Sequence, residues 1–169
     1  MIRSQSQFAI WDLDNCLSDD RGRIRLIDWS QDNPDLRYNP YHAGCANDRC
    51  HNLDVFTTIS QLARPVFFTS RPEAVRAETT RWIRCELDLQ QPIIIMRPEK
   101  DHTPSLALKT EMLAQYIDTM LKSSNGMQPC FAAFDDREDI VDMYRWHGID
   151  AAILNIHSVC AYTPPKELS

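Results

Sequence analysis

The sequence predicts an α/β domain whose core is a parallel β-sheet with helices on both faces. Short apolar runs typical of strands recur along the 169 residues, and segments with helical spacing of apolar residues lie between them. This alternation favours a parallel sheet, because a crossover helix is the usual connection between neighbouring parallel strands. Asp12 and Asp14 directly follow the first apolar run, and ligands of open α/β sheets bind at the carboxyl ends of the strands.

The chain up to residue 96 contains three expected strands and two expected helices. Residues 7–12 form an apolar run that leads into the acidic pair and predict the first strand. Residues 52–63 have an incomplete apolar stripe and predict a helix. Residues 65–69 predict a buried strand bounded by proline, and residues 73–87 predict a second helix. Residues 92–96, with three consecutive isoleucines, predict the next strand.

The second half contains the clearest helix. Residues 105–121 have apolar side chains at helical spacing, and the Asn125-Gly126 pair predicts a turn after them. Residues 130–135 predict a strand, residues 137–147 a helix and residues 150–156 a final strand. The whole chain, residues 1–169, is therefore expected to be a single domain.

One segment, residues 18–51, does not fit the pattern. It has no clean period and contains two turn signals, at residues 32–35 and 39–40. Long irregular segments in compact domains are usually lids or binding loops, so we expect a small irregular lid inserted after the first strand, over the Asp12 edge. The segment also contains two histidines and two cysteines whose spacing departs from that of zinc fingers; zinc binding and packing within the lid are the alternatives for His42, Cys45, Cys50 and His51.

The overall composition excludes several classes of protein. The net charge of −6 argues against a large nonspecific nucleic-acid surface, and we expect no extended nucleic-acid track. No apolar run approaches the roughly 20 residues of a membrane span, and the N-terminus lacks a signal-peptide pattern, so we expect a cytoplasmic protein without membrane contact. The six cysteines are dispersed and are interpreted as reduced thiols. The sequence leaves the oligomeric state open.

Polar residues follow two further expected strands. Thr69, Ser70 and Arg71 come after one of them, and Asp135 and Asp136 end another. Lys109 lies early in the helix expected between them. If these groups and the first acidic pair meet at one sheet edge, they provide a nucleophile, an acid/base, a cation and donors for phosphoryl oxygens, which is what phosphoryl transfer requires. Two carboxylates at this edge are also suitable ligands for Mg²⁺. Taken by itself, each motif can alternatively be a polar turn without a catalytic role.

These motifs resemble those of the haloacid-dehalogenase-type phosphohydrolases, which have a Rossmann-like core. Residues 12–16, Asp-Leu-Asp-Asn-Cys, resemble the family's first motif, with Cys16 in place of the usual threonine. Thr69 resembles the second motif and Lys109 the third, and the pair at 135–136 resembles the fourth. Order and spacing agree with this family.

A closer resemblance is to the 3′-phosphatase domain of phage polynucleotide kinases and to its standalone phage relatives. Residues 68–72, 96–98 and 134–145 carry it, together with Asp101. The sequence contains no Gly-x-x-x-x-Gly-Lys-Ser/Thr loop, so the kinase half is missing. The resemblance implies a Mg²⁺-dependent phosphomonoesterase that acts on nucleotides or 3′-phosphorylated oligonucleotides, in the host-cell cytoplasm if the protein is phage-encoded.

The resemblance also implies roles for individual residues. Asp12 would attack phosphorus and form an aspartyl-phosphate, and Asp14 would protonate the leaving oxygen and then activate water. Thr69 would donate to the phosphoryl group, and Lys109 would neutralise its charge. Mg²⁺ would be held by the Asp12 carboxylate, the Asp14 backbone carbonyl, Asp135 and the neighbouring Asp136.

Ser70, Arg71 and Arg97 are the candidate substrate-binding residues. Either arginine can clamp a phosphate with two hydrogen bonds, or it can pair with an acid such as Asp101 or Glu73 instead. Two other functions remain open beside the leading one: a 5′-nucleotidase acting on free deoxynucleotides, and a non-catalytic binding protein on a phosphatase scaffold. The second would be indicated by loss of a catalytic residue, and none is lost.

Overall fold

The computed structural model describes residues 7–123 and 131–157, and its core is a parallel sheet of five strands. The strand order is β5-β4-β1-β6-β7, with β1 at Phe8–Trp11, β4 at Arg64–Pro72, β5 at Ile93–Arg97, β6 at Phe131–Asp135 and β7 at Asp150–Ile153. All of the neighbouring pairs in this sheet run parallel. The predicted α/β class and parallel sheet are confirmed.

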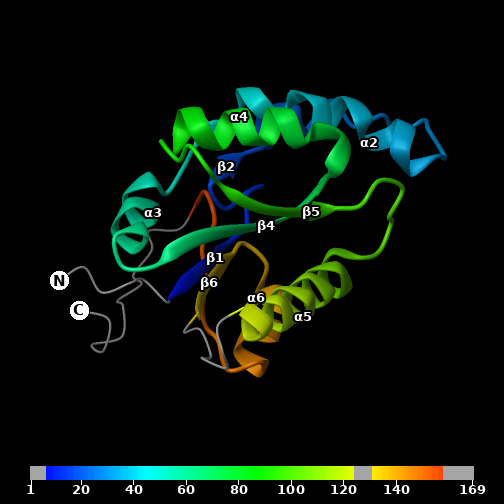
Figure 1. The fold of residues 1–169 in the computed structure, drawn as a ribbon. Coiled ribbons are helices and arrows are strands. Elements are labelled where there is room, and N and C mark those ends of the chain that lie inside the picture. Colours follow the sequence, from blue (N-terminus) through cyan, green and yellow to red (C-terminus); the bar gives the residue numbers. More distant parts are fainter. Residues whose placement is uncertain (1–6, 124–130, 158–169) are drawn as a thin grey trace.

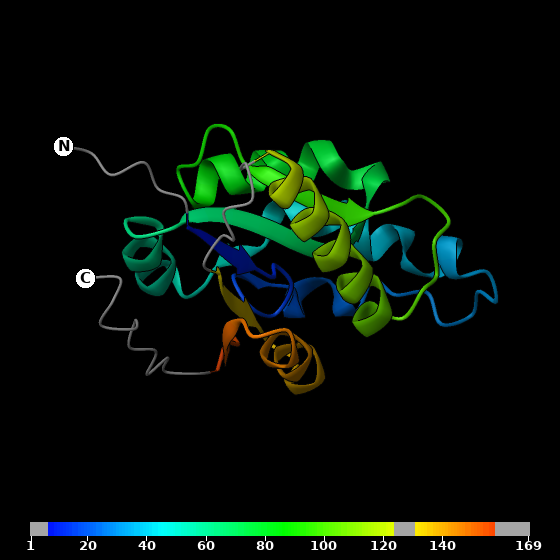
Figure 2. The ribbon, with the colours of Figure 1, turned by 60° about the horizontal axis from the view of Figure 1, so that its bottom comes forward.

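Helices cover both faces of the sheet (Figure 1). One face carries α3 (Leu53–Ser60), the short 3-10 helix η2 (Glu73–Val75) and α4 (Arg76–Glu86). The opposite face carries α5 (Ser105–Ser123) and α6 (Glu138–Trp146). Figure 2 shows α5 lying across the sheet with α6 beside it. The two layers seal the central strand from both sides.

The side chains of β1 alternate between these two layers, as the two-residue period of a strand requires. Trp11 belongs to the apolar cluster that includes Trp82 of α4. Ile10 belongs to the opposite cluster, with Leu113 of α5 and Tyr144 of α6. Because all four residues of β1 are buried, this strand is fixed from both faces, and so is the start of the acidic segment that follows it.

The segment 18–51, predicted to be irregular, contains regular structure. It forms β2 (Ser18–Asp19), α1 (Arg21–Ile24), α2 (Pro34–Ala43), the 3-10 helix η1 (Gly44–Asn47) and β3 (Arg49–Cys50). β2 and β3 pair antiparallel in a small second sheet. The predicted place of the insertion, directly after β1, agrees with the structure, but its irregularity does not.

Helix α2 was missed because its start signal resembles a turn. The Asn33 side chain accepts a hydrogen bond of 2.9 Å from the backbone N–H of Asp35, which is an N-terminal cap. Pro34 is the first helical residue, a position at which its missing N–H costs nothing. The Asn-Pro pair therefore begins a helix rather than a turn. None of the ten residues of α2 is buried.

Other boundaries differ by a few residues. β4 continues to Pro72, past an irregularity in its pairing with β5 between Thr69 and Pro72. The predicted turn at Asn125-Gly126 and the predicted strand start at Cys130 lie outside the described residues. Within residues 7–123 and 131–157, no helix has the length and apolar character needed to cross a bilayer.

Candidate active site

The acidic residues of the site follow the ends of two neighbouring strands. Asp12 comes directly after β1, and its backbone N–H donates to the carbonyl of Phe134 in β6 at 2.9 Å. β6 itself ends at Asp135, and Asp136 comes next. Because parallel strands end at the same edge of the sheet, residues more than a hundred positions apart in the sequence meet there.

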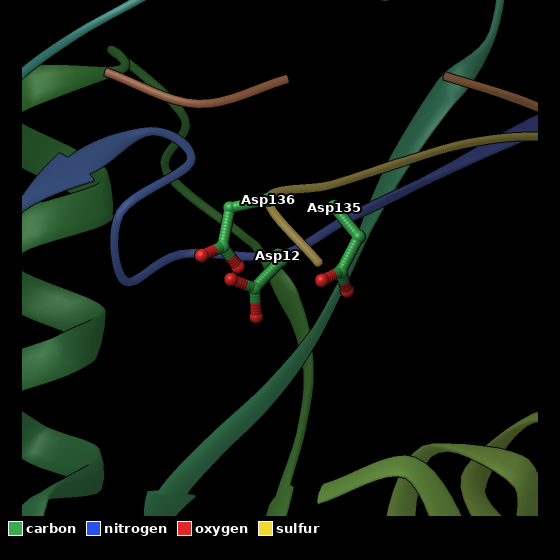
Figure 3. A group of neighbouring side chains, drawn as sticks. All are labelled: Asp12, Asp135 and Asp136. Carbon is green, nitrogen blue, oxygen red and sulfur yellow. The ribbon is translucent and has the colours of Figure 1, made fainter. Parts of the chain in front are cut away.

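Asp12, Asp135 and Asp136 form a compact carboxylate cluster. Each offers an oxygen atom, and these three oxygens lie within 4.8 Å of one another. Figure 3 shows the three side chains gathered where β1 and β6 end. The predicted ligand side chains are thus brought together, while the side chain of Asp14 lies outside this group of three.

Lys109 provides the cation of the cluster. Its Nζ donates to Asp12 Oδ1 at 2.5 Å and to Asp135 Oδ2 at 2.6 Å, and all three side chains are buried. Burial alone would lower the pKa of Lys109, but the two carboxylates outweigh it and hold that pKa well above its ordinary value. Burial raises the pKa of Asp12, against the opposing effect of Lys109.

The charges of the cluster do not balance. When ionised, three carboxylates face one ammonium, which leaves two negative charges. Burial also raises the pKa of Asp136, as expected for an anion that lacks sufficient countercharge. An all-oxygen donor set with an excess of two negative charges fits a hard divalent cation such as Mg²⁺.

Asp14 is held by two buried arginines rather than by the cluster. Its Oδ1 accepts from Arg71 Nη2 at 2.5 Å and from Arg71 Nε at 2.9 Å, and it also pairs with Arg23. Burial raises the pKa of Asp14, but the two guanidinium groups more than offset this and lower it to about 2. In this arrangement Asp14 is a carboxylate at neutral pH.

In the structure, Arg71 pairs with acidic side chains. It has no exposed surface, and besides Asp14 it contacts the hydroxyl of Ser18 at 2.8 Å and Asp48 at 3.3 Å. Of the two alternatives for Arg71, a substrate phosphate or an acidic side chain, the structure therefore shows pairing with acids, Asp14 and Asp48 in place of the examples Asp101 and Glu73. Arg23 also donates to Asp48, at 2.9 Å. These contacts anchor the segment 18–51 to the site.

Thr69, Ser70 and Arg97 lie along the end of β4 and beside it. The buried Thr69 hydroxyl accepts the backbone N–H of Arg71 at 3.2 Å, so its own proton remains available to donate. Ser70 Oγ lies 3.0 Å from Ser105 Oγ. Arg97 donates to backbone carbonyls at distances of 2.6–3.2 Å, those of Ser70, Asp101 and Thr103. Its guanidinium braces the loop after β5 and pairs with no carboxylate that the structure describes.

A cavity of about 970 Å³ opens above these groups. Its polar base includes Asp12, Asp14, Lys109 and Asp136. Residues of α2 and of the loop at residues 98–104 form much of its walls. The segment predicted to be a lid therefore forms a wall of the cavity over the acidic edge.

Sequence reasoning did not assign the roles that three residues play in shaping this site: Asn15, Arg23 and Asp48. Asn15 adopts the left-handed conformation, with φ of 62°, and its side-chain amide donates to Asp136 Oδ2 at 2.7 Å. Asparagine is among the few non-glycine residues that tolerate this conformation, which is a signal available in the sequence. Arg23 belongs to the alternating arginines at 21–25, but no pattern marked the middle one as buried.

The four possible zinc ligands do not form a site. Cys45 is buried with its Sγ 3.7 Å from Thr79 Oγ1, and Cys50 Sγ contacts the carbonyl of His51 at 3.6 Å. Throughout the part of the chain that the structure describes, the carboxylate cluster is the group whose geometry suits a metal ion. Cys45 belongs to the apolar cluster that includes Trp82, so it packs the segment against α4.

Comparison with known proteins identifies the family. The family model described as the polynucleotide kinase PNKP phosphatase domain matches residues 6–155. A chain of the Pnkp1/Rnl/Hen1 complex shares the fold, with a TM-score of 0.64 and 20% identity over 92% of this chain. A chain of the Pnkp1/Rnl/Hen1 RNA repair complex gives a TM-score of 0.62 and 20% identity over 90% of this chain. The matches span 48% and 43% of those longer chains. The search of curated proteins finds no match.

Proposed function

Because the chain belongs to the family of polynucleotide kinase PNKP phosphatase domains, and is thus a phosphatase of the haloacid-dehalogenase type, we propose that it removes the 3′-phosphate from nucleotides or nucleic-acid ends. The observation that carries the proposal is the ion-pair group of Asp12, Lys109 and Asp135, of which Asp12 and Lys109 line a cavity large enough for a nucleotide. The charge imbalance at this group supports Mg²⁺ as the cofactor.

Asp12 is the proposed nucleophile. A carboxylate oxygen of Asp12 attacks phosphorus, the bond between phosphorus and the ribose oxygen breaks, and an aspartyl-phosphate forms. Bound Mg²⁺ would be held by the carboxylates of Asp12, Asp135 and Asp136, with the Asp14 backbone carbonyl as the further predicted ligand, and would supply positive charge that favours the ionised form of Asp12. Lys109 places its ammonium beside the same carboxylate and offsets the charge of the phosphoryl oxygens.

Asp14 is the proposed acid and base. It gives a proton to the departing ribose oxygen, and it then takes a proton from the water that attacks the aspartyl-phosphate. Its pKa of about 2 in the free site is too low for the first of these steps. A bound phosphate dianion next to Asp14 raises that pKa, because a like charge disfavours a second anion and also competes for Arg23 and Arg71.

Thr69, Ser70 and Arg97 have supporting proposed roles. The hydroxyl proton of Thr69 is available to a phosphoryl oxygen. Ser70 and Arg97 line the cavity, where they can contact substrate. Because the guanidinium of Arg97 is occupied by backbone carbonyls, its main effect is to hold the wall formed by the loop at residues 98–104. Arg71 holds Asp14 in place, and a bound phosphate can reach its guanidinium only in competition with that carboxylate.

The experiment compares kcat/KM for 3′-phosphorylated and 5′-phosphorylated forms of the same oligonucleotide and mononucleotide. We expect the 3′-phosphorylated form of each to be preferred, with Asp12→Asn reducing turnover of all substrates by more than about 10³-fold through loss of the nucleophile. A preference for 5′-mononucleotides would assign the protein to the 5′-nucleotidases and leave the residue roles intact. Absence of hydrolysis of any phosphomonoester would favour the binding-protein alternative.

A further inference from the structure

Helix α2 presents aromatic side chains to the cavity rather than to a core. Tyr38, Tyr41 and His42 all line the cavity, and no residue of α2 is buried. A ten-residue helix normally buries one apolar face to be stable, so a helix without a buried residue leaves a face that something else can cover.

These rings continue outward to an exposed tryptophan and form what we term the aromatic row: Trp29, Tyr38, Tyr41 and His42. The ring centroids of Trp29 and Tyr38 are 6.3 Å apart, and those of Tyr38 and Tyr41 are 6.5 Å apart. The His42 ring lies 5.0 Å from that of Tyr41 and 6.3 Å from that of Tyr38, so the three α2 rings form a mutually contacting group at the inner end of the row.

The row leads from the surface to the catalytic edge. Trp29 is 68% exposed, whereas the other rings are half-buried. At the inner end, the guanidinium of Arg23 lies 4.2 Å from the centre of the Tyr41 ring, and the same guanidinium pairs with Asp14. A ligand whose phosphate reaches the acidic edge therefore has aromatic faces along its way out of the cavity.

Resting on the proposed function, we propose that the aromatic row binds the last bases of a single strand that carries the 3′-phosphate. The terminal base lies against Tyr38 inside the cavity, and the next base stacks on Trp29 outside it. Aromatic rings stack with any base because every base has a flat π-face, so this surface selects single strands without selecting sequence.

Two polar features of the same wall suit this occupant. The guanidinium of Arg37 lies over one face of the Trp29 ring, 5.8 Å from its centre, which leaves the other face for a base and places a positive charge where it can neutralise the phosphate between two bases. His42 Nδ1 is buried and has no hydrogen-bond partner within residues 7–123 and 131–157. Buried polar atoms are normally paired, so a polar group of the bound strand is a fitting partner for it.

The row is short, and this limits the footprint to about two nucleotides. The net charge of −6 and a ring contact of Trp29 with just one arginine among the described residues allow few phosphate contacts. Affinity should therefore fall only shallowly with salt concentration, in contrast to that of a protein with a long basic track.

The test combines side-chain and base deletion. Trp29→Ala should lower kcat/KM for a 3′-phosphorylated trinucleotide about tenfold, within the range for loss of one base–aromatic stack. It should leave a 3′-phosphorylated mononucleotide and p-nitrophenyl phosphate unchanged, while Trp29→Phe retains most of the preference. Trp146→Ala, which removes a ring that is 88% exposed on α6, should change none of these values and serves as the matched control.

A trinucleotide with an abasic penultimate position completes a double-mutant cycle between the Trp29 side chain and the penultimate base. Wild type should lose about the same factor on this substrate, and Trp29→Ala should show no second loss, because both changes remove the same stack. Independent losses that multiply, or equal effects of Trp29→Ala on the mononucleotide and the trinucleotide, would overturn the proposal.

Failure of the proposed function gives a different result. In that case wild type cleaves p-nitrophenyl phosphate but no 3′-phosphorylated substrate. In that case, the affinity of a labelled trinucleotide without a terminal phosphate, measured by fluorescence anisotropy, tests separately whether the aromatic row binds bases. Weaker binding by Trp29→Ala than by wild type and Trp146→Ala supports base binding by the aromatic row, and equal binding by all three proteins rejects it.

Discussion

Removal of the Lys109 ammonium should strongly destabilise the protein without bound metal. We choose Lys109→Met, which keeps an unbranched apolar side chain of similar length in a site where the lysine is 2% exposed. The substitution leaves Asp12 and Asp135 buried without the cation that lies 2.5 and 2.6 Å from them. Breaking a buried ion pair in this way typically costs about 3–5 kcal/mol.

The assay is urea unfolding in EDTA, together with thermal unfolding. For a domain of this size, such a loss corresponds to a decrease in Tm of roughly 10 °C. Lys122→Met is the matched control, because Lys122 is on the same helix and pairs with Asp118 at 2.5 Å but is 74% exposed. Its loss should cost less than about 0.5 kcal/mol.

Addition of Mg²⁺ should stabilise Lys109→Met more than wild type, because the variant has one more uncompensated negative charge at the cluster. The reasoning would be refuted if the free energy of unfolding of Lys109→Met in EDTA lay within about 1 kcal/mol of the wild-type value. It would also be refuted if the exposed control were destabilised equally.

Three further outcomes follow from the site. EDTA should abolish phosphatase activity and Mg²⁺ should restore it, because the donor set is made of oxygen atoms; full activity in the chelated enzyme would reject the metal. Asn15→Gly keeps the left-handed backbone but removes the amide that donates to Asp136, so calorimetric titration should show Mg²⁺ binding at least about tenfold weaker at an unchanged Tm, and unchanged affinity would contradict this role. Asp14 has its pKa lowered to about 2, so its ion pairs stabilise the fold above pH 4 by about 2 kcal/mol, and this contribution fades as the pH falls toward 2. Urea unfolding of wild type and Asp14→Asn should therefore differ most at neutral pH and converge in acid, and a difference independent of pH would contradict the ion-pair account.

The sequence allowed the sheet and the acidic edge to be predicted because both depend on local patterns. An apolar run followed by Asp12, and another that ends in Asp135, is enough to place two carboxylates at neighbouring strand ends once the sheet is parallel. The position of Lys109 early in its helix follows in the same way.

Contacts between segments that are far apart in the sequence have no comparable local pattern from which they could be predicted. The burial of Arg23 depends on Asp14 from one segment and Asp48 from another, and both are brought to it by tertiary folding. The sequence left two partners open for Arg71, a substrate phosphate or an acidic side chain. Only three-dimensional packing shows that it pairs with an acid. Helix α2 was missed for a different reason, since Asn33-Pro34 is a common pair both in turns and at helix starts.

The central place of β1 in the sheet has a consequence for how the protein acquires activity as it folds. β1 pairs Ala9 with Ala132, 123 positions later in the chain, so the strand that precedes the proposed nucleophile stays unpaired on one side until β6 has arrived. Closing so long a loop is slow compared with the formation of local helices. During refolding, helical signal should therefore return before hydrolysis does, and activity reports the completion of the fold rather than its onset.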